Sequence, residues 1–500
     1  MGSLRPTFRP TRAAWYRRPG GPWDAGSLDA ALSAGGGAVV DGSLRLTAGQ
    51  MLDRVAAVAG ALRQSGVRRG DVVAWQLPNG WESHALYRAC WRLGAIAAPV
   101  HHAAGPEDRA RALSQVSPRV VVSSVSSLPS GPPVSLPASA GRPSDLAVVL
   151  FTAGSTGQPK AVLHTQRGLL AKARTMVGAH ALCRDDVVLM PAPAAHVSGL
   201  LNGVLVPGVA GMRTVWMARW EPSAAVGVID AEQVTFMIGP PTFFVTLMQA
   251  PAFSPARVGS LRLISSGGAG VTPSFVDEAT ATFGALVKRT YGSTEAPTMT
   301  TSSAEDPPDR ARSTDGRPTG EAEVRVVDRA SGRDQPTGAT GEVWVRGPEL
   351  FVGYTSVPAT LEAFARGGWF RTGDLGQVDD DGWLTIVGRI KDVIIRGGEN
   401  ISATEIEAHL EAHPAVLQAA AVGYPDDRLG ERVCAVVVAL ERFDLADCRT
   451  WFESRGVSRF KWPERVVQLR SMPLLGAGKV DRAALRARAA HYEEPDPLFP

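Results

Sequence analysis

The sequence is poor in several features that would point to particular classes of protein. It has four cysteines in 500 residues, Cys90, Cys183, Cys434 and Cys448, and no two of them form a CxxC pair. Neither a disulfide framework nor a zinc knuckle is therefore expected, and a reducing cytoplasm suits the chain. The formal net charge is only +3, from 52 basic and 49 acidic residues, which does not indicate a nucleic-acid partner.

Long hydrophobic runs are also absent. The longest apolar stretch, residues 199–212, is interrupted by Asn202 and Pro207 and falls short of the roughly 20 residues that cross a bilayer. The first 23 residues are basic and contain several prolines, without the apolar core of a signal peptide. No membrane span is predicted. The arm 5–18 is expected to be a solvated tail, with a peripheral membrane contact as the alternative.

The chain is long enough for at least two domains, and its 44% hydrophobic and 20% charged residues are typical of a globular protein. Helix-like and strand-like segments alternate from the start. Residues 48–65 and 83–93 predict helices, whereas residues 71–77 and 95–100 predict strands. This rhythm predicts a parallel sheet covered by helices.

The pattern changes further along the chain. Residues 123–145, rich in serine and proline, predict a loop, and the apolar strand 146–152 follows it. Short strands with glycine and proline turns over residues 320–354 predict a small β-barrel or meander. The fold class is therefore α/β, with a large N-terminal domain of βα-layered subdomains and a small β-barrel over residues 1–390. A small C-terminal α+β domain is expected over residues 391–500.

A glycine-rich segment follows strand 146–152 directly. Its residues are Thr152, Ala153, Gly154, Ser155, Thr156, Gly157, Gln158, Pro159 and Lys160. The two glycines let backbone N–H groups turn toward an anion, the hydroxyls add donors and the lysine adds a charge, as in a polyphosphate-binding loop. It is not a Walker A loop, because the glycine spacing differs and Ala161 replaces the hydroxyl residue that would bind magnesium.

Further motifs follow in a fixed order. They are Tyr-Gly-Ser-Thr-Glu at 291–295, Trp-Phe-Arg-Thr-Gly-Asp-Leu at 369–375, Gly-Arg-Ile-Lys-Asp at 388–392, Gly-Gly at 397–398 and Gly-Ala-Gly-Lys at 476–479. Together with the glycine-rich loop, this series resembles the adenylate-forming superfamily of acyl-CoA synthetases, nonribosomal adenylation domains and beetle luciferases. The resemblance extends from about residue 28 to residue 485, and residues 394–401 look most like the acyl-CoA synthetase branch.

The resemblance implies an ATP- and Mg²⁺-dependent enzyme. It would activate a carboxylic acid as an acyl-adenylate and then form a thioester with coenzyme A. Because the triphosphate repels the incoming carboxylate, positioning and charge neutralisation must supply most of the catalysis. The resemblance implies catalytic roles for Lys479, Thr294, Glu295 and His196, with Glu295 as the ligand of Mg²⁺.

Binding residues are implied in the same way. For ATP or AMP they are Thr152, Ser155, Thr156, Gly157, Lys160, Gly267, Gly268, Ala269, Tyr291, Gly292, Ser293, Asp374 and Arg389. Asp374 would accept hydrogen bonds from the ribose hydroxyls, with Arg389 nearby, and Tyr291 would offer a stacking face to adenine. The acid pocket would be lined by His196, Val197, Leu200, Met237, Phe243 and Pro297, which suggests an apolar medium-chain, aryl or alicyclic acid.

Members of the superfamily use one site for two steps by rotating a mobile C-terminal domain. Lys391 would be the hinge. One orientation would bring Lys479 to the phosphates, and the other would present Gly397 and Gly398 to the thiol channel, where glycines let the pantetheine arm pass close to the backbone.

Plainer interpretations stand beside these roles. Glu295 would cap a helix, Asp374 would occupy an ordinary turn, and Lys479 would be solvated. His101 and His102 are expected to be structural or solvated.

Several alternatives for the whole chain also remain open at this stage. They are an adenylation enzyme that loads a carrier protein, an inactive ATP-binding scaffold and a luciferase-like oxygenase. Leu474 and Leu475 depart from the usual basic and Thr or Asn residues of the terminal motif, which leaves open an enzyme that adenylates well and transfers poorly.

Overall fold

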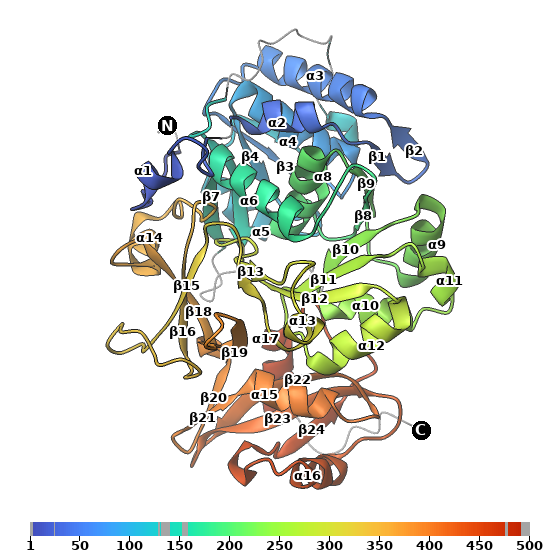
Figure 1. Ribbon diagram of the computed structural model, residues 1–500, viewed down its shortest axis with the longest axis vertical. Coiled ribbons are helices and arrows are strands. Elements are labelled where there is room, and N and C mark those ends of the chain that lie inside the picture. Colours follow the sequence, from blue (N-terminus) through green and yellow to red (C-terminus); the bar gives the residue numbers. More distant parts are fainter. Residues whose placement is uncertain are drawn as a thin grey trace.

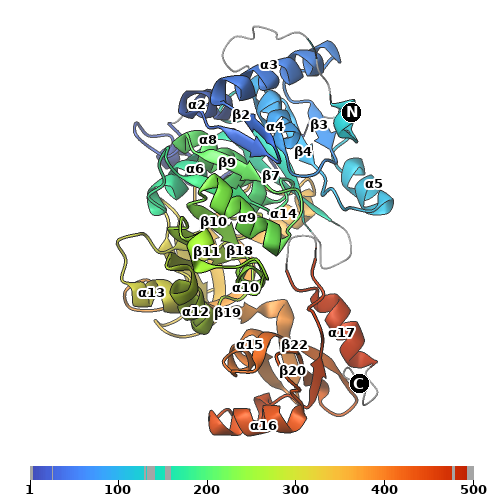
Figure 2. The same ribbon diagram turned by 90° about the vertical axis from the view of Figure 1, so that its right-hand side faces the viewer.

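The computed structural model describes residues 4–24, 26–128, 131, 141–152, 159–475 and 479–491 (Figure 1). Two α/β layers and an antiparallel sheet form the upper part of the molecule in this view. A smaller domain, coloured orange to red, lies below them. The smaller domain stands clear of the rest on most sides when the molecule is turned (Figure 2).

The first sheet has five strands in the order β5-β3-β4-β6-β7. Their bounds are β3 Val72–Trp75, β4 Ile96–Pro99, β5 Val120–Val122, β6 Leu146–Thr152 and β7 Lys160–Thr165. Strands β3, β4, β5 and β6 pair in parallel and β7 pairs with β6 in antiparallel register. The parallel sheet expected from the alternating segments is therefore confirmed.

The second sheet has nine strands in the order β14-β13-β12-β11-β10-β8-β9-β1-β2. Their bounds are β1 Val39–Asp41, β2 Leu44–Leu46, β8 Val187–Met190, β9 Arg213–Trp216, β10 Phe236–Gly239, β11 Leu263–Gly267, β12 Leu286–Tyr291, β13 Thr300–Thr301 and β14 Arg317–Pro318. From β12 to β1 every neighbouring pair is parallel, so the carboxyl ends of these strands meet at one edge. Such an edge is where α/β sheets place their ligands.

Helices cover both α/β sheets. Their bounds are α2 Leu28–Gly35, α3 Ala48–Gln64, α4 Trp81–Leu93, α5 Pro106–Ser114, α6 Gln166–Ala179, α7 Val197–Leu200, α8 Val206–Ala210, α9 Pro222–Glu232, α10 Pro241–Met248, α11 Pro255–Val258, α12 Pro273–Phe283 and α13 Pro308–Ser313, with a π-helical turn at Leu201–Leu205. Helix α3 starts at a capping box of Thr47 and Gln50, and α4 ends where Gly94 takes a left-handed conformation. No helix in the described part of the chain is long and apolar enough to span a membrane.

The third sheet is antiparallel, with the order β15-β16-β18-β17 and β19 paired to β18. Its elements are β15 Glu323–Val327, β16 Gly341–Arg346, α14 Val357–Ala363, β17 Phe364–Ala365, β18 Trp369–Val378 and β19 Leu384–Arg389. Short strands were expected over residues 320–354, and the sheet continues to residue 389; β17 lies between β16 and β18 in sequence but pairs only with the start of β18, so the strands are not in the consecutive order of a simple meander. Tyr291, at the carboxyl end of β12, donates a hydrogen bond to Asp374 of β18, and the candidate site lies at that contact.

The C-terminal part has its own sheet and its own core. Its elements are β20 Val393–Arg396, β21 Glu399–Ser402, α15 Ala403–Glu411, β22 Val416–Asp426, β23 Gly430–Ala439, α16 Leu445–Ser454, β24 Arg465–Gln468 and α17 Arg482–Ala490. Two hydrophobic clusters, one on each face of this sheet, consist only of residues between 394 and 489. The predicted α+β character is confirmed.

The N-terminal arm differs from the prediction. Its short helix α1, Ala13–Tyr16, ends at a tyrosine that is 1% exposed, and Trp23 is also buried. The Trp23 indole donates a hydrogen bond to the carbonyl of Pro348 (2.9 Å), and the Thr7 hydroxyl donates to the carbonyl of Tyr354 (2.7 Å). The arm is therefore docked against the third sheet, and the expectation of a solvated tail is wrong. Burial of its aromatic side chains stabilises this position, while its arginines stay at the surface.

Candidate active site

The centre of the candidate site is a carboxylate held by residues from two sheets. Asp374 in β18 has 7% of its side chain exposed. The Tyr291 phenol, at the end of β12, donates a hydrogen bond to its Oδ2 (2.8 Å), and Nε of Arg389 lies 2.9 Å from its Oδ1. Arg389 is also the backbone partner of Asp374 across the β18–β19 pair. These contacts fix the carboxylate at the carboxyl edge of the nine-stranded sheet.

A bulge in β18 aims Asp374 at this edge. The β16–β18 register runs from Glu342 opposite Leu375 to Trp344 opposite Arg371. Three residues of β18, 372–374, therefore lie opposite the single residue Val343 of β16. Gly373 takes a φ of 73°, which a residue with a Cβ rarely adopts. Bulges re-aim side chains, so the motif Thr-Gly-Asp provides both the bulge and the carboxylate.

The segment after β12 turns back on itself without forming a helix. Gly292 has no space for a side chain, because a Cβ there would lie 2.3 Å from the backbone nitrogen of Thr298. Ser293 donates its N–H to the carbonyl of Ala296 (2.9 Å), which closes the turn. Residues 292–299 contain no helix, so the alternative in which Glu295 only caps one is wrong.

Two buried side chains from other elements hold the turn at Thr294 and Glu295. The imidazole Nε2 of His164, in β7, lies 2.7 Å from the carbonyl of Thr294. The phenol of Tyr354 donates to Oε1 of Glu295 (2.8 Å). Burial lowers the pKa of His164 to about 4, so the ring is neutral at neutral pH and donates to the carbonyl. The turn is therefore anchored to the first and third sheets.

The end of β11 forms another wall of the site. Gly267 is packed so closely that a Cβ would lie 2.3 Å from the carbonyl oxygen of Thr290. Gly268 has a φ of 81° and, with Ala269, is exposed. Backbone without side chains thus lies open beside Tyr291, which suits a flat ring such as a purine.

Lys479, from the C-terminal part, reaches this wall. A Cβ on Gly268 would lie 3.3 Å from its Cε. Burial, followed by the charge of Arg389, lowers the pKa of Lys479 to about 8, while the charges of Asp374 and Glu295 act in the opposite direction. Lys479, 184 residues from Glu295 in sequence, thus shares an electrostatic environment with it.

His196 lies close to the same lysine. It precedes α7, and burial, with added repulsion from Lys479 and then His101, lowers its pKa to about 4. His101 and His102 stack with ring centroids 4.6 Å apart. His101 and His102 were expected to be structural or solvated, and His101 lies close enough to contribute to the lowered pKa of His196.

The glycine-rich loop is seen only at its two ends. Ser155, Thr156 and Gly157 lie outside the described residues. Thr152 and Lys160 face each other as the last pair of the β6–β7 ladder, and Nζ of Lys160 lies 5.1 Å from the ring centroid of Tyr354. Lys160, which follows the loop, therefore lies beside the tyrosine that contacts Glu295.

The predicted acid-pocket residues are not all on one side of the nine-stranded sheet. Leu200 packs between the two α/β sheets, with Val197 at the edge of that cluster. Met237 packs against the helices on the other face, because successive residues of β10 point in opposite directions. Phe243 stacks on Trp220 (4.7 Å between ring centroids), and Pro297 is buried in the turn after β12. Met237 and Leu200 therefore do not line one pocket.

The predicted hinge residue lies near this centre, since the charge of Lys391 helps to lower the pKa of Lys479, whereas the predicted thiol-channel residues lie in a hairpin of the C-terminal part. Lys391 is exposed in a short 3-10 turn, Ile390–Asp392, where the chain passes from β19 to β20. Gly397 and Gly398 form the exposed tip of the β20–β21 hairpin, with φ angles of 59° and 89°. The neighbour of Gly397 there is Leu429, also in the C-terminal part, so this arrangement does not bring the tip to Asp374.

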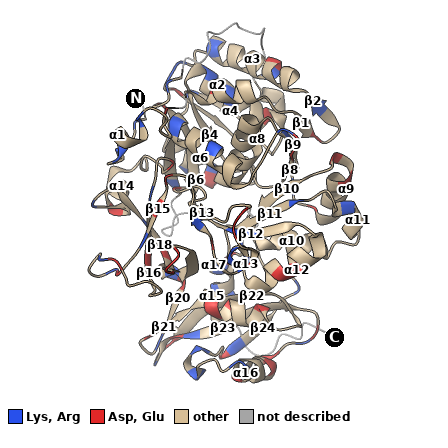
Figure 3. Cartoon of the chain, viewed as in Figure 1, with Lys and Arg blue, Asp and Glu red and all other residues tan. Residues whose placement is uncertain are grey.

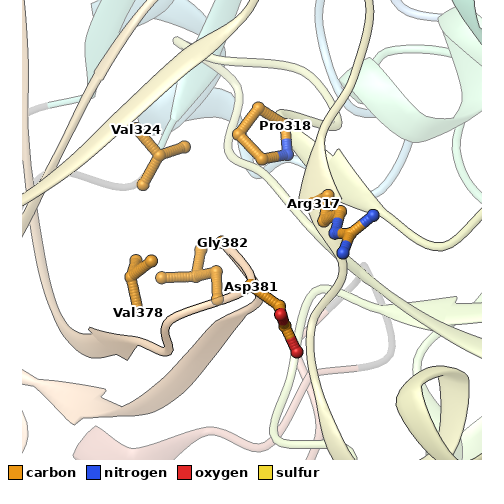
Figure 4. A pocket seen from close by; sticks show the side chains of 7 residues that line it. Arg317, Pro318, Val324, Val378, Asp381 and Gly382 are labelled. Carbon is orange, nitrogen blue, oxygen red and sulfur yellow. The ribbon is translucent and has the colours of Figure 1, made fainter. Parts of the chain in front are cut away.

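A surface pocket of about 480 Å³ lies elsewhere, between β14 and the β18–β19 turn (Figure 4). Arg317 and Asp381 stand at its rim, and it contains none of the predicted site residues. No group of three metal-ligating side chains occurs among the residues that the structure describes. Basic and acidic residues are interspersed over both parts of the molecule (Figure 3).

Three residues that contact the site were not singled out from the sequence. Besides His164 and Tyr354, Lys172 is fully buried and donates to the carbonyl of Thr298 (2.7 Å), with Glu349 as its ion-pair partner (2.7 Å). A buried polar residue in an otherwise apolar strand, such as His164 in β7, was the one available signal. Nothing in the local sequence indicates what Lys172 or Tyr354 touches.

Comparison with known proteins agrees with this geometry. Residues 30–136 and 126–355 match the family of AMP-binding enzymes, and residues 405–479 match the C-terminal domain of AMP-binding enzymes. The fold and the site thus define an adenylate-forming enzyme. The chain belongs to the AMP-binding enzyme family.

Curated relatives align with almost the whole chain. The medium-chain fatty-acid–CoA ligase of Escherichia coli (strain K12) is 31% identical, with 96% of this chain and 93% of the relative covered. The 2-hydroxy-7-methoxy-5-methyl-1-naphthoate–CoA ligase of Streptomyces carzinostaticus is 33% identical, with 95% of each chain covered.

A solved structure, ATP-bound MatB from Rhodopseudomonas palustris, matches with a TM-score of 0.84 and 27% identity, covering 93% of this chain and 99% of the other. The apo structure of MatB matches at the same coverage with a TM-score of 0.77. The arrangement of the present structure is therefore nearer to the ATP-bound one.

Proposed function

We propose that the chain is an AMP-forming acid–thiol ligase that activates an apolar carboxylic acid with ATP and transfers the acyl group to coenzyme A. One observation carries the proposal. Lys479 of the C-terminal part meets Gly268 at the edge of the sheet, and the charges of Asp374 and Glu295 act on it there. A distant lysine and two carboxylates converge, as a site for a nucleotide triphosphate requires.

The nucleotide would lie across the carboxyl edge. Asp374, buried and already accepting from Tyr291 and Arg389, would accept the ribose hydroxyls. The exposed backbone of Gly268 and Ala269 would lie against adenine, supported by Gly267. These residues fit such a ligand, because the wall is exposed backbone and the neighbouring side chain is a hydrogen-bond acceptor.

The triphosphate would meet the turn after β12 and the glycine-rich loop. Thr294 would donate to an α-phosphate oxygen, next to Gly292 and Ser293. Lys160 and Thr152 would hold the outer phosphates with the loop residues between them. Glu295 would hold Mg²⁺, a hard cation that neutralises phosphate charge, since Oε1 accepts from Tyr354 and the carboxylate has a second oxygen.

Lys479 and His196 would lie where the substrate carboxylate meets the α-phosphorus. The substrate carboxylate attacks the α-phosphorus, a P–O bond to the acyl oxygen forms, and the bond to pyrophosphate breaks. Lys479 would stabilise the charge that develops on the transferring phosphoryl group. His196, neutral because burial lowers its pKa to about 4, would border the carboxylate without adding charge.

The second half-reaction would use a different orientation of residues 391–500. The division at residue 390 is supported by the two clusters confined to residues 394–489, and Lys391 would be the hinge. Turning about it would withdraw Lys479 and bring Gly397 and Gly398 to the thiol channel. The CoA thiolate then attacks the acyl carbon and AMP leaves.

The acid is proposed to be apolar, of medium-chain, aryl or alicyclic type. Relatives that act on medium-chain fatty acids and on a substituted naphthoate support this class. A carrier protein as the final acceptor is the alternative, and it requires the same adenylation site.

Two assays test the function. ATP–pyrophosphate exchange across a panel of acids should be supported by an apolar acid and be lost in Lys479→Ala. It should be retained in Lys461→Ala, a control on the same domain whose Nζ pairs with Glu405 (2.6 Å) away from the site. Thioester formation with free CoA should follow. If none of the acids in the panel supports exchange, adenylation is refuted. If exchange occurs but no CoA thioester forms, the carrier protein is favoured as the acceptor.

A further inference from the structure

One buried tyrosine contacts both of the charged side chains proposed to face the triphosphate. Tyr354 is 3% exposed and lies between β16 and α14. Its phenol donates to Oε1 of Glu295 (2.8 Å), and its ring centroid lies 5.1 Å from Nζ of Lys160. The proposed metal ligand and the loop lysine are thus linked through one ring.

Tyr354 is fixed from several directions. Its N–H donates to the hydroxyl of Thr360 (2.8 Å), and its carbonyl accepts from the hydroxyl of Thr7 (2.7 Å). Its backbone also forms an isolated antiparallel β-bridge with Val162 of β7. Its ring packs edge-on against Phe351, with centroids 4.9 Å apart. Three separate parts of the chain, including the N-terminal arm, therefore hold the phenol in one place.

The chemistry of the contact has a fixed direction. A phenol hydroxyl carries a proton to donate, so the 2.8 Å hydrogen bond runs from Tyr354 to Oε1 of Glu295. A carboxylate only accepts, so Oε1 is occupied and oriented while Oε2 remains for a cation.

The ring also affects the lysine. Its face attracts the ammonium of Lys160, and no ion pair joins Lys160 to Glu295 although both are in the described part of the chain. An ion pair between them would neutralise the groups that phosphate and metal need.

We propose that Tyr354 is a positioning residue that orients Glu295 for a divalent cation and holds Lys160 apart from it. The inference rests on the proposed function, since it concerns how that site is prepared before ATP arrives. The N-terminal arm contacts the same tyrosine through the hydroxyl of Thr7.

The experiment separates the hydroxyl from the ring. Tyr354→Phe keeps the ring and removes the donor, so the affinity for Mn²⁺ in the presence of ATP, measured by electron paramagnetic resonance, should fall about 10-fold, as loss of a hydrogen bond to a charged group does. Binding of metal-free ATP, measured by calorimetry in EDTA, should be unchanged. Tyr354→Leu removes the ring too, and both affinities should fall.

Two controls make the result specific. Tyr424→Phe is the matched change in the C-terminal part, where Cζ of Arg465 lies 4.3 Å from the ring centroid, and it should change neither affinity. In a Glu295→Gln background, Tyr354→Phe should have no further effect on Mn²⁺, because the two residues act through one contact.

An unchanged Mn²⁺ affinity in Tyr354→Phe, or an equal loss in the Glu295→Gln background, would overturn the proposal. Failure of the proposed function is a different result. It would appear as an absence of pyrophosphate exchange in the unmodified enzyme, whatever its metal affinity. Thermal melting of each variant identifies one that has not folded. The comparison of Glu295→Gln with and without Tyr354→Phe then decides whether the two residues act through one contact.

Discussion

Replacing Lys479 with methionine should have opposite effects on domain closure and on catalysis. In the present orientation burial lowers the pKa of Lys479 from 10.5 to about 8. A charged lysine is therefore disfavoured here, relative to an orientation in which it is solvated. The difference corresponds to at most about 3 kcal/mol, from roughly 1.4 kcal/mol for each pKa unit, less whatever solvent screens at a partly exposed side chain.

The sign of this linkage sets the pH window. Below pH 8 the lysine is charged in both orientations, and closure without nucleotide carries the full penalty. As the pH rises from about 8 to 10.5, the closed form loses the proton first and closure becomes easier. Lys479→Met removes the charge at every pH, so at pH 7 it should shift the empty enzyme toward closure by about 10- to 100-fold.

Fluorescence transfer between the two parts of the chain measures this shift. Cys183 is exposed whereas Cys90, Cys434 and Cys448 are buried, so Cys183 and an introduced Arg449→Cys accept the two dyes. ATP should shift the unmodified enzyme toward closure more than it shifts the variant. The negative phosphates offset the cost of burying the charged lysine, and methionine carries no such charge. Adenylation should fall at least about 10²-fold in the variant.

Lys461→Met is the control, since it removes a lysine that pairs with Glu405 on the same domain. A Lys479→Met enzyme that, without nucleotide, is no more closed than the unmodified enzyme would contradict the reasoning from burial.

Three further predictions concern other parts of the structure. Asp374→Ala should raise the KM for ATP about 10-fold or more with little change in the KM for the acid; an unchanged ATP dependence would remove the ribose assignment. Lys172→Met leaves the carboxylate of Glu349 buried without its cation, so the free energy of unfolding by urea should fall by about 3–5 kcal/mol, and a loss below 1 kcal/mol would show that the pair is not buried in solution. Trp23→Ala removes a buried ring and its bond to Pro348, so it should lower stability by about 3 kcal/mol and expose the arm to proteolysis; equal protease resistance would show that the arm is not docked.

Much of the secondary structure was predictable because it follows from local chemistry. Strand β6 has the predicted bounds, and α3 ends one residue before its predicted end. Alternating apolar patterns and the capping box at Thr47 act over a few residues, so they are legible without the fold. The order of the motifs likewise indicated a family, because each motif is a short run.

Errors arose where burial depends on remote partners. Met237 and Leu200 both look apolar, but strand alternation in β10 places Met237 on the face away from Leu200. The N-terminal arm looks like a solvated tail because its prolines and arginines are visible in sequence. The partners of Tyr16 and Trp23, Ala171 and the carbonyl of Pro348, lie more than a hundred positions away in sequence.

The sequence by itself indicated the reaction class, through the resemblance of its ordered motifs to those of adenylate-forming enzymes; the glycines, hydroxyls, carboxylates and lysines of these motifs are residue types that phosphate and carboxylate chemistry require. Only the tertiary structure decided which of these residues meet. Asp374 reaches Tyr291 through a bulge and a strand pairing, and Lys479 reaches Gly268 across the junction of the two domains. Hydrogen bonds and charges act over a few ångströms of space, whatever the separation along the chain, so the contact of Tyr354 with Glu295 is invisible until the chain is folded.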